Sequence, residues 1–198
     1  MKIRFLTGHR GRIAASLCAA SLLTLMSLAH AFEGKDAKRI VAIGGSVTEI
    51  VYALGEQDRL VARDTTSNFP GEANSLPDVG YIRALSPEGV LSVNPDLIVA
   101  LKGSGPKEAM DALKQAAVPI AEISDRYDAA GVSEKVRQVG AAIGVPEKAE
   151  ELALAVEGKL KSAAEKAAAA KPRKVIFVLS MQGGKVMAAG EESSADGI

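Results

Sequence analysis

The sequence has almost no cysteine or histidine, and this scarcity limits the chemistry open to it. Its 198 residues include one cysteine, Cys18, and two histidines, His9 and His30, all within the first 31 residues. Residues 32–198 therefore contain no disulfide, no cysteine or histidine metal ligand, and no histidine base for the usual catalytic triads. Catalysis by carboxylates or by a metal stays open, but no carboxylate cluster indicates it. We expect a protein that is not an enzyme.

An excess of charge of either sign is also lacking. The chain has 24 basic and 24 acidic residues. Residues 1–31 contain four of the basic residues and no acidic one, so the rest of the chain has 20 basic against 24 acidic residues, a net charge of −4. A nucleic-acid binder would need a basic patch, so we expect no nucleic-acid partner.

Residues 1–31 have the pattern of a secretory signal peptide. A basic start precedes an apolar run from Ile13 to Leu28, and residues 29–31 form a small-x-small cleavage site before Phe32. The run is shorter than the roughly 20 apolar residues of a membrane-spanning helix. We expect cleavage near Ala31 and export of the mature chain.

From Arg39 onward the pattern alternates between strand and helix. Apolar runs predict strands at residues 40–43, 60–63, 96–101 and 119–123, and helical spacing predicts helices at residues 46–54, 86–93 and 107–117. Ser46 and Glu49 predict a capping box for the first helix. The alternation predicts an α/β fold, in which residues 32–125 form an N-terminal ligand-binding lobe with a central, mostly parallel sheet flanked by helices.

The remaining chain is predicted to be a helical linker and the start of a second lobe. Residues 126–170 should form the linker, with a helix at residues 133–143 and a long strut helix from Pro146 to about Ala170. An apolar stripe at helical spacing marks the strut, at Leu152, Val156, Leu160 and Ala164. Residues 171–198 open with an apolar strand at residues 174–180 and predict a truncated second α/β lobe, because a hairpin alone is marginal in water.

The stretch from Pro77 to Asp96 has the arrangement of a binding site. Tyr81 follows a glycine, Arg83 comes two residues later, and a helix start follows at once. Ser86 can cap that helix, and Glu88 suits the positive end of its dipole. Tyr81 and Arg83 are therefore predicted to lie on a loop between a strand and a helix. Without further information, Tyr81 would more often be a partly buried loop residue with a satisfied hydroxyl.

The chain resembles the periplasmic haem-binding proteins of bacterial haem ABC importers, which belong to the two-lobed binding proteins that also carry siderophores and cobalamin. The resemblance covers the chain from about Arg39 to its end. It is most specific in GGSVTEIVYALG at residues 44–55, LPDVGYIRALSPEGVLS at residues 76–92 and NPDLI at residues 94–98. It implies a periplasmic monomer that captures haem as its transported ligand and delivers it to an ABC permease in the inner membrane.

The same resemblance implies roles for three residues. Tyr81 matches the tyrosine of a glycine-tyrosine-x-arginine motif that ligates haem iron, and a phenolate is a hard oxygen ligand suited to ferric iron. Arg83 would pair with a haem propionate or support the phenolate by a charged hydrogen bond. Glu88 matches an acidic residue that pairs with an arginine of the permease, although complementarity to the helix dipole also explains it.

Two departures from the family pattern qualify these expectations. Some relatives place a histidine or an arginine of the second lobe against the haem, but this chain has no histidine after residue 31. We therefore expect five-coordinate iron bound by Tyr81, and a fragment of a protein that continues for roughly another hundred residues. The alternative is a siderophore or cobalamin binder of the same architecture, in which Tyr81 would line the pocket without touching iron.

Overall fold

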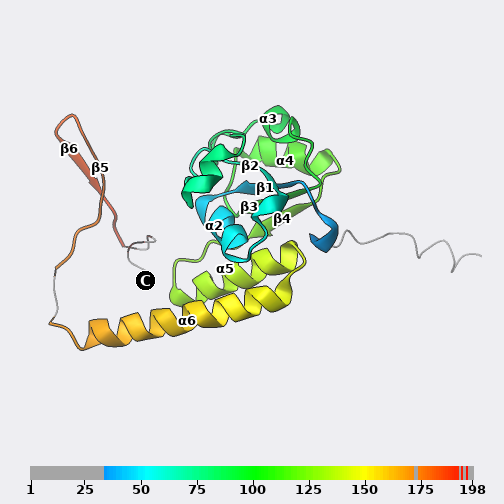
Figure 1. Ribbon diagram of the computed structural model, residues 1–198. Coiled ribbons are helices and arrows are strands. Elements are labelled where there is room, and N and C mark those ends of the chain that lie inside the picture. The colour runs from blue at the N-terminus through cyan, green and yellow to red at the C-terminus, as the bar shows by residue number, and fades with distance from the viewer. Residues whose placement is uncertain (1–33, 172–173, 192, 194, 196–198) are drawn as a thin grey trace, which may run out of the picture. The chain divides into compact units, whose positions relative to one another are not determined.

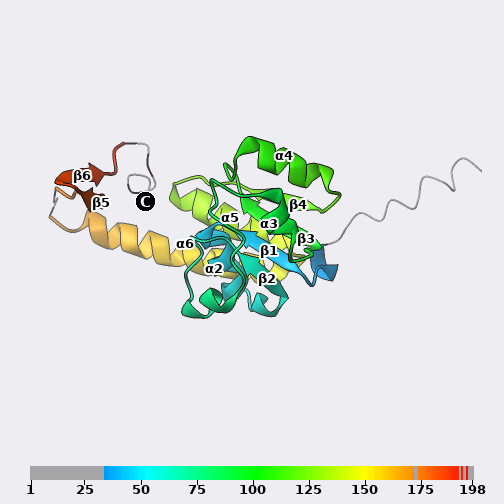
Figure 2. The ribbon, with the colours of Figure 1, turned by 90° about the horizontal axis from the view of Figure 1, so that it is seen from above.

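The central feature of the fold is a parallel sheet of four strands in the order β2-β1-β3-β4. The structure, a computed structural model, describes residues 34–171, 174–191, 193 and 195, so the predicted signal peptide lies outside the described residues. The strands are β1 (Ile40–Ile43), β2 (Leu60–Arg63), β3 (Leu97–Leu101) and β4 (Ile120–Ile123) (Figures 1 and 2). All four predicted strands and the α/β class are confirmed.

Helices cover both faces of this sheet (Figure 1). On one face lie α2 (Gly45–Ala53) and α5 (Ala129–Ala142), and on the other lie α3 (Pro87–Leu91) and α4 (Lys107–Gln115). Strand β1 is buried along its whole length, and its alternate side chains contribute to both apolar clusters: Ile40 to the first and Val41 to the second. Short 3-10 turns complete the lobe at η1 (Gly34–Asp36), η2 (Gln57–Arg59) and η3 (Gly71–Ser75).

Helix α6 (Pro146–Ala168) packs back along α5, which confirms the predicted long helix. The two helices approach closely at Gly140, where an added Cβ would lie 2.0 Å from the Cβ of Ala149. The predicted apolar stripe was wrong in part. Ala149 and Ala153 are the buried residues, Leu152 only packs against the core, and Ala164 is exposed because the second half of α6 contacts no core residue among those described.

The start of α2 differs from the prediction. No side chain caps this helix, and its N-cap is Gly44, so the predicted capping box of Ser46 and Glu49 is wrong. Gly44 has a φ of 110°, a conformation that favours glycine. A Cβ at this position would also lie 2.5 Å from Cδ1 of Leu101. The tight turn after β1 therefore depends on backbone geometry, and it places Ser46 inside the first helical turn.

Two further element boundaries were also predicted incorrectly. Helix α5 begins at Ala129 because the carboxylate of Asp128 accepts a 2.7 Å hydrogen bond from the Gly131 amide, and so caps the helix four residues before the predicted start. The predicted strand at residues 174–180 begins later, as β5 (Val178–Gln182), which pairs with β6 (Lys185–Ala188) in an antiparallel hairpin. The division into lobes at residues 125 and 170 stays a prediction.

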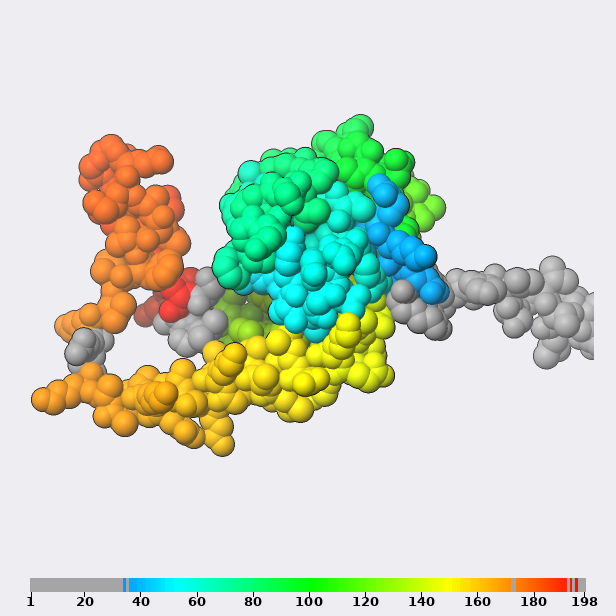
Figure 3. Space-filling view, viewed as in Figure 1, coloured from blue at the N-terminus to red at the C-terminus, as the bar shows by residue number. Residues whose placement is uncertain are grey.

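The surface beside α2 carries a shallow hollow. Figure 3 shows α2 in cyan next to the teal segment that contains η3. A cavity of about 600 Å³ lies between them and is lined by Tyr52 of α2, by Phe69 and by Glu72 of η3, among others. Among the described residues, no helix is both long and apolar enough to cross a membrane.

Candidate functional site

Tyr81 and Arg83 lie on the loop that leads into α3, as predicted. Tyr81 is 46% exposed, and Arg83 is exposed as well. Tyr81 begins a tight turn in which the Ala84 amide donates a 2.7 Å hydrogen bond to its carbonyl oxygen. No full strand precedes this loop, because only a single bridge between Arg63 and Asp78 extends the sheet there. The loop thus presents an accessible phenol and a guanidinium two residues apart.

The first end of this loop is bonded to the carboxyl end of β2. The Val79 amide donates a 3.0 Å hydrogen bond to the carbonyl of Arg63, and the Thr65 amide donates one of the same length to the carbonyl of Gly80. Gly80 has a φ of 107°, so the residue just before Tyr81 needs the conformational freedom of glycine. These bonds fix the backbone on the N-terminal side of Tyr81.

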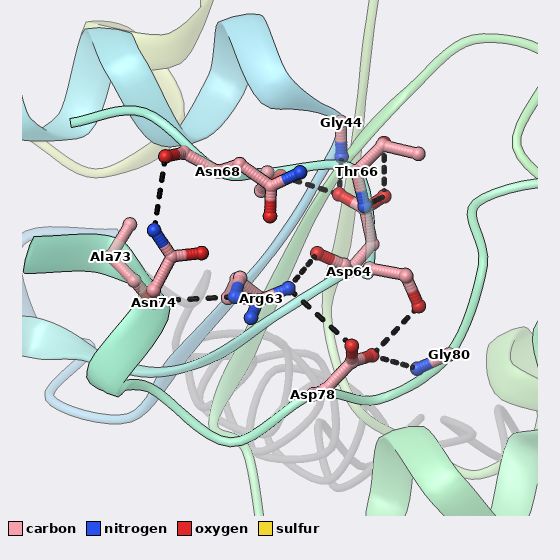
Figure 4. A network of polar contacts seen from close by, with 11 residues as sticks. Gly44, Arg63, Asp64, Thr66, Asn68, Ala73, Asn74, Asp78 and Gly80 are labelled. Atoms are coloured by element: carbon pink, nitrogen blue, oxygen red, sulfur yellow. Dashed lines mark hydrogen bonds and ion pairs between the residues drawn. The ribbon is translucent and has the colours of Figure 1, made fainter. Parts of the chain in front are cut away.

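The carboxylate of Asp78 adds side-chain bonds to this anchor (Figure 4). It accepts hydrogen bonds from the Gly80 amide at 2.8 Å and from the Thr65 hydroxyl at 3.0 Å, and it pairs with Arg63 at 3.4 Å. Hydrogen bonds to a charged acceptor are stronger than neutral ones. Asp78 therefore ties the residue before Tyr81 to the residues that end β2.

Asp64 forms a second, buried part of the same network. Its side chain is fully buried, and its carboxylate accepts hydrogen bonds from the amides of Gly44 and Thr66, at 2.8 and 2.9 Å, and from the hydroxyls of Thr66 and Ser67. Four donors compensate for burying the charge. Asp64 thereby joins the turn after β1 to the turn after β2, and both turns lie at the carboxyl edge of the sheet (Figure 4).

The second end of the Tyr81 loop is bonded to the loop after β3. The Gly105 amide donates to the carbonyl of Ile82, and the Leu85 amide donates to the carbonyl of Gly105, both at 2.9 Å. The segment that carries Tyr81 and Arg83 is consequently attached to the carboxyl ends of two strands that flank β1. In open parallel sheets, ligands bind outside the carboxyl ends of the strands, where the strand order changes direction. Here that change occurs at β1.

Glu88 lies at the second position of α3 and is exposed. The prediction for the start of this helix is confirmed: the Ser86 hydroxyl accepts a 2.9 Å hydrogen bond from the Gly89 amide, and Pro87 is the first helical residue. The structure brings Glu88 into no contact with Tyr81 or Arg83. Its side chain lies at the surface of the lobe, and its docking role stays a prediction.

The two other tyrosines have different environments. Tyr52 lies within α2 and packs against the apolar cluster; burial, followed by the negative charges of Glu72 and Asp58, raises its pKa. Tyr127 is 47% exposed and follows β4. In the described part of the chain, no group of three or more His, Cys, Asp or Glu side chains could hold a metal ion. The assignment of Tyr81 as an iron ligand stays a prediction.

Sequence reasoning named Tyr81, Arg83 and Glu88, whose roles stay predictions, and it missed the residues that position the loop. Asp64 and Thr65 were interpreted only as part of a polar loop, and no role was predicted for the side chain of Asp78. A signal was present, since Asp64 follows directly on the buried strand β2. An acidic residue at the carboxyl end of a buried strand must find hydrogen-bond donors in the neighbouring turns.

Residues 40–196 match the periplasmic binding protein family. The chain belongs to this family. Among solved structures, it is similar to the periplasmic haem-binding protein RhuT of Roseiflexus sp. RS-1 in its apo form, with a TM-score of 0.77 and 34% identity. That similarity covers 81% of this chain and 62% of RhuT. The predicted membership of the binding-protein family that carries haem, siderophores and cobalamin is confirmed.

Two further proteins are also similar to the chain. The uncharacterized ABC transporter substrate-binding lipoprotein YvrC of Bacillus subtilis is 33% identical over 135 residues, which are 67% of this chain and 43% of YvrC. The vitamin B12-binding protein of Yersinia pestis is 36% identical over 107 residues, 54% of this chain and 36% of that protein. The chain thus spans less than two thirds of each relative. These relatives are binding proteins rather than enzymes, in agreement with the expectation from composition.

Proposed function

We propose that the chain is the haem-capturing part of a periplasmic substrate-binding protein that delivers haem to an ABC-type import permease. The observation that carries this proposal is the position of Tyr81, whose exposed phenol lies on a loop bonded at both ends to the ligand-binding edge of the sheet. A phenolate oxygen is a hard ligand suited to ferric iron. The similarity to RhuT, a haem-binding protein, supports haem as the ligand.

Within this proposal the three site residues have separate roles. Tyr81 supplies the axial oxygen ligand of the haem iron. Arg83, exposed on the same loop, forms a charge-assisted bond to a haem propionate or to the phenolate. Glu88, exposed at the start of α3, pairs with a basic residue of the permease. Family membership supports a location outside the cytoplasm, where the predicted signal peptide would direct the chain.

A titration with hemin tests the proposal. The Soret band should shift on binding, and a phenolate-to-iron charge-transfer band should appear, because the bound iron is high-spin and carries Tyr81. Tyr81→Phe should lose that band while the circular dichroism of the fold persists. Tyr127→Phe is the matched control, since Tyr127 is equally exposed but lies on another loop. If Tyr81→Phe retains the spectrum and affinity of the wild type, the proposal is wrong.

A cobalamin is the second candidate ligand. The observation in its favour is the 36% identity to a vitamin B12-binding protein. A cobalamin binder should bind cyanocobalamin more tightly than hemin, and Tyr81→Phe should then alter affinity only modestly, through a lost pocket contact. Parallel titrations with cyanocobalamin and hemin therefore distinguish the two ligands in one experiment.

A further inference from the structure

The hollow beside α2 has two aromatic residues in its lining (Figure 3). It measures about 600 Å³, and these residues are Tyr52 of α2 and Phe69, which Pro70 follows. Phe69 is 66% exposed, more than any other large hydrophobic residue described between residues 34 and 171. One exposed apolar residue is ordinary, but two rings that line one cavity form a surface suited to a partner. The proposed function gives this surface no role.

Hydrogen bonds hold the segment that carries Phe69. The side-chain amide of Asn74 donates a 3.2 Å hydrogen bond to the carbonyl of Asn68 (Figure 4). The Ala73 amide donates a 2.9 Å hydrogen bond to the carbonyl of Pro70, which closes the first turn of η3. The backbone on both sides of Phe69 is therefore tied down. A partner that contacts this ring needs to order little additional chain, which lowers the entropic cost of binding.

The hollow is also acidic. Its charged lining residues are Glu49 and Glu72, and no lysine or arginine among the described residues lines it, so the charge of the lining is −2. Both glutamates are exposed, and neither forms an ion pair within the described part of the chain. Burial, followed by the charges of Glu72 and Asp58, raises the pKa of Tyr52 above its ordinary value of 10.0. Its phenol therefore stays protonated and can donate a hydrogen bond.

We propose that this hollow docks an extended, proline-rich segment of a partner protein, with lysine or arginine between the prolines. Such segments adopt a preformed polyproline II helix and bind in aromatic-lined grooves. This helix has no internal hydrogen bonds, so its carbonyls can accept one from the phenol of Tyr52. The two glutamates pair with the basic side chains and favour this partner over a neutral proline-rich segment.

The shape of the hollow favours an extended chain over a small organic cation. A helix, α2, borders it on one side and the segment of Phe69 and η3 on the other, and the hollow between them is shallow. A small cation would need a more enclosed site to lose most of its contact with water. An extended segment can instead cross the hollow and contact both rings and both carboxylates.

Three fluorescent peptides of about ten residues, long enough to cross the hollow in a polyproline II helix, test the inference. The first alternates proline with lysine, the second glycine with lysine, and the third proline with serine. By fluorescence anisotropy, the second and third should bind at least about five-fold more weakly than the first, because each lacks one of the two recognised features. If the glycine–lysine peptide binds as tightly, the hollow attracts cations in general and the inference is overturned. Equal binding of the proline–serine peptide would overturn the role of the glutamates and with it the proposed partner.

Two variants locate the binding at the hollow. Phe69→Ala removes the exposed ring and should weaken the proline–lysine peptide about five-fold or more. Glu72→Gln should weaken it about two- to five-fold, and this loss should disappear in about 1 M salt. The matched controls are Leu154→Ala and Glu165→Gln, at exposed residues of α6 outside the hollow, and both should bind as the wild type does.

Unchanged peptide binding by Phe69→Ala, or equal losses in the variants and their controls, would overturn the inference. Saturating hemin should not displace the peptide, because the hollow is separate from the loop that presents Tyr81. Displacement would show that hemin and peptide share one site; it would overturn the inference and leave the proposed function standing.

Discussion

The carboxylate of Asp78 accepts a 2.8 Å hydrogen bond from the backbone amide of Gly80, the residue that directly precedes Tyr81. This short link connects the conformation of the phenol-bearing loop to one acidic side chain. We expect Asp78 to act on a ligand only by positioning this loop. Its removal should therefore affect the ligand through the geometry of Tyr81.

Asp78→Ala should lower the free energy of unfolding by about 1 to 2 kcal/mol, because it removes charged hydrogen bonds to Gly80 and Thr65. Asp78→Asn keeps an acceptor for the Gly80 amide and should cost less. Hemin affinity should fall in the same order, with a weaker charge-transfer band in Asp78→Ala. Asp58→Ala, at an exposed acid outside the network, should change neither quantity. Urea unfolding measures the stability, and hemin titration measures the affinity. Equal stability and equal hemin affinity of Asp78→Ala and Asp58→Ala would contradict the positioning role of Asp78.

Gly44→Ala should destabilise the lobe by about 1 to 3 kcal/mol, since an alanine would be strained at a φ of 110° and its Cβ would clash with Leu101. Gly55→Ala is the matched control: Gly55 has a φ of 73° but no atom within 4 Å of an added Cβ. That variant should therefore show backbone strain alone. In a Leu101→Ala background, which has its own packing cost, adding Gly44→Ala should show only the backbone strain. Midpoints of chemical denaturation measure these losses. An equal loss of stability in Gly44→Ala and Gly55→Ala would contradict the clash with Leu101.

The ion pairs of the Glu56 carboxylate should make the stability of the fold depend on pH. A hydrogen bond from Lys148, and a weaker one from Arg59, lower its pKa from the ordinary value of 4.5. Because the folded pKa is depressed, the unfolded chain takes up the proton more readily as pH falls. The stabilisation is thus complete above about pH 5 and is lost as pH falls through the folded pKa.

Glu56→Gln should therefore reduce stability at neutral pH by no more than about 1 kcal/mol, because Lys148 is largely exposed and its pairing is screened. The variant should also show a shallower loss of stability between about pH 5 and pH 3. Urea midpoints at several pH values, for the wild type and the variant, measure this difference. Identical pH profiles would show that the Glu56 pairs contribute nothing.

Glu88→Ala should weaken docking to the permease without changing hemin affinity, because Glu88 is exposed and makes no contact with Tyr81 or Arg83. The loss of an acidic residue from the first turn of a helix costs a few tenths to about 1 kcal/mol in stability. Glu108→Ala is the matched control, at the corresponding first turn of α4. Both should share the small stability cost, but only Glu88→Ala should weaken binding to the permease in lipid nanodiscs. Equal docking by the two variants would leave Glu88 with the helix-dipole role alone.

The sequence predicted the elements whose signal is local. Strand β1 was found because four consecutive apolar residues precede a glycine turn, and α3 was found because Ser86 and Pro87 have one favoured position in a helix. The start of α2 was missed because it depends on the contact of Gly44 with Leu101, which is 57 residues away. Contacts at such separations leave no periodic pattern in the sequence.

The same limit applies to the candidate site: residues within one short motif could be named from the sequence, but bonds between distant turns could not. Tyr81 and Arg83 were named from a short motif in which they stand two positions apart, and their roles stay predictions. The bonds of Asp78 and Asp64 join turns after different strands, and they follow only once β1 and β2 are paired. The partition of the chain into a lobe, a linker and a second lobe stays a prediction for the same reason, because lobes are defined by their contacts.

The strand order also dictates when the site can form. Ile40 of β1 pairs with Leu60 of β2 on one side and with Leu97 of β3 on the other, and the Tyr81 loop is encoded between those two partners. A chain that emerges from a translocation channel with its N-terminus first must leave one edge of β1 unpaired until residue 97 has followed. Pairing across such a sequence distance is slow, and an open apolar edge invites association with other chains. The second end of the Tyr81 loop is bonded to Gly105, which follows β3, so this loop can reach its full set of hydrogen bonds only after β3 has joined the sheet.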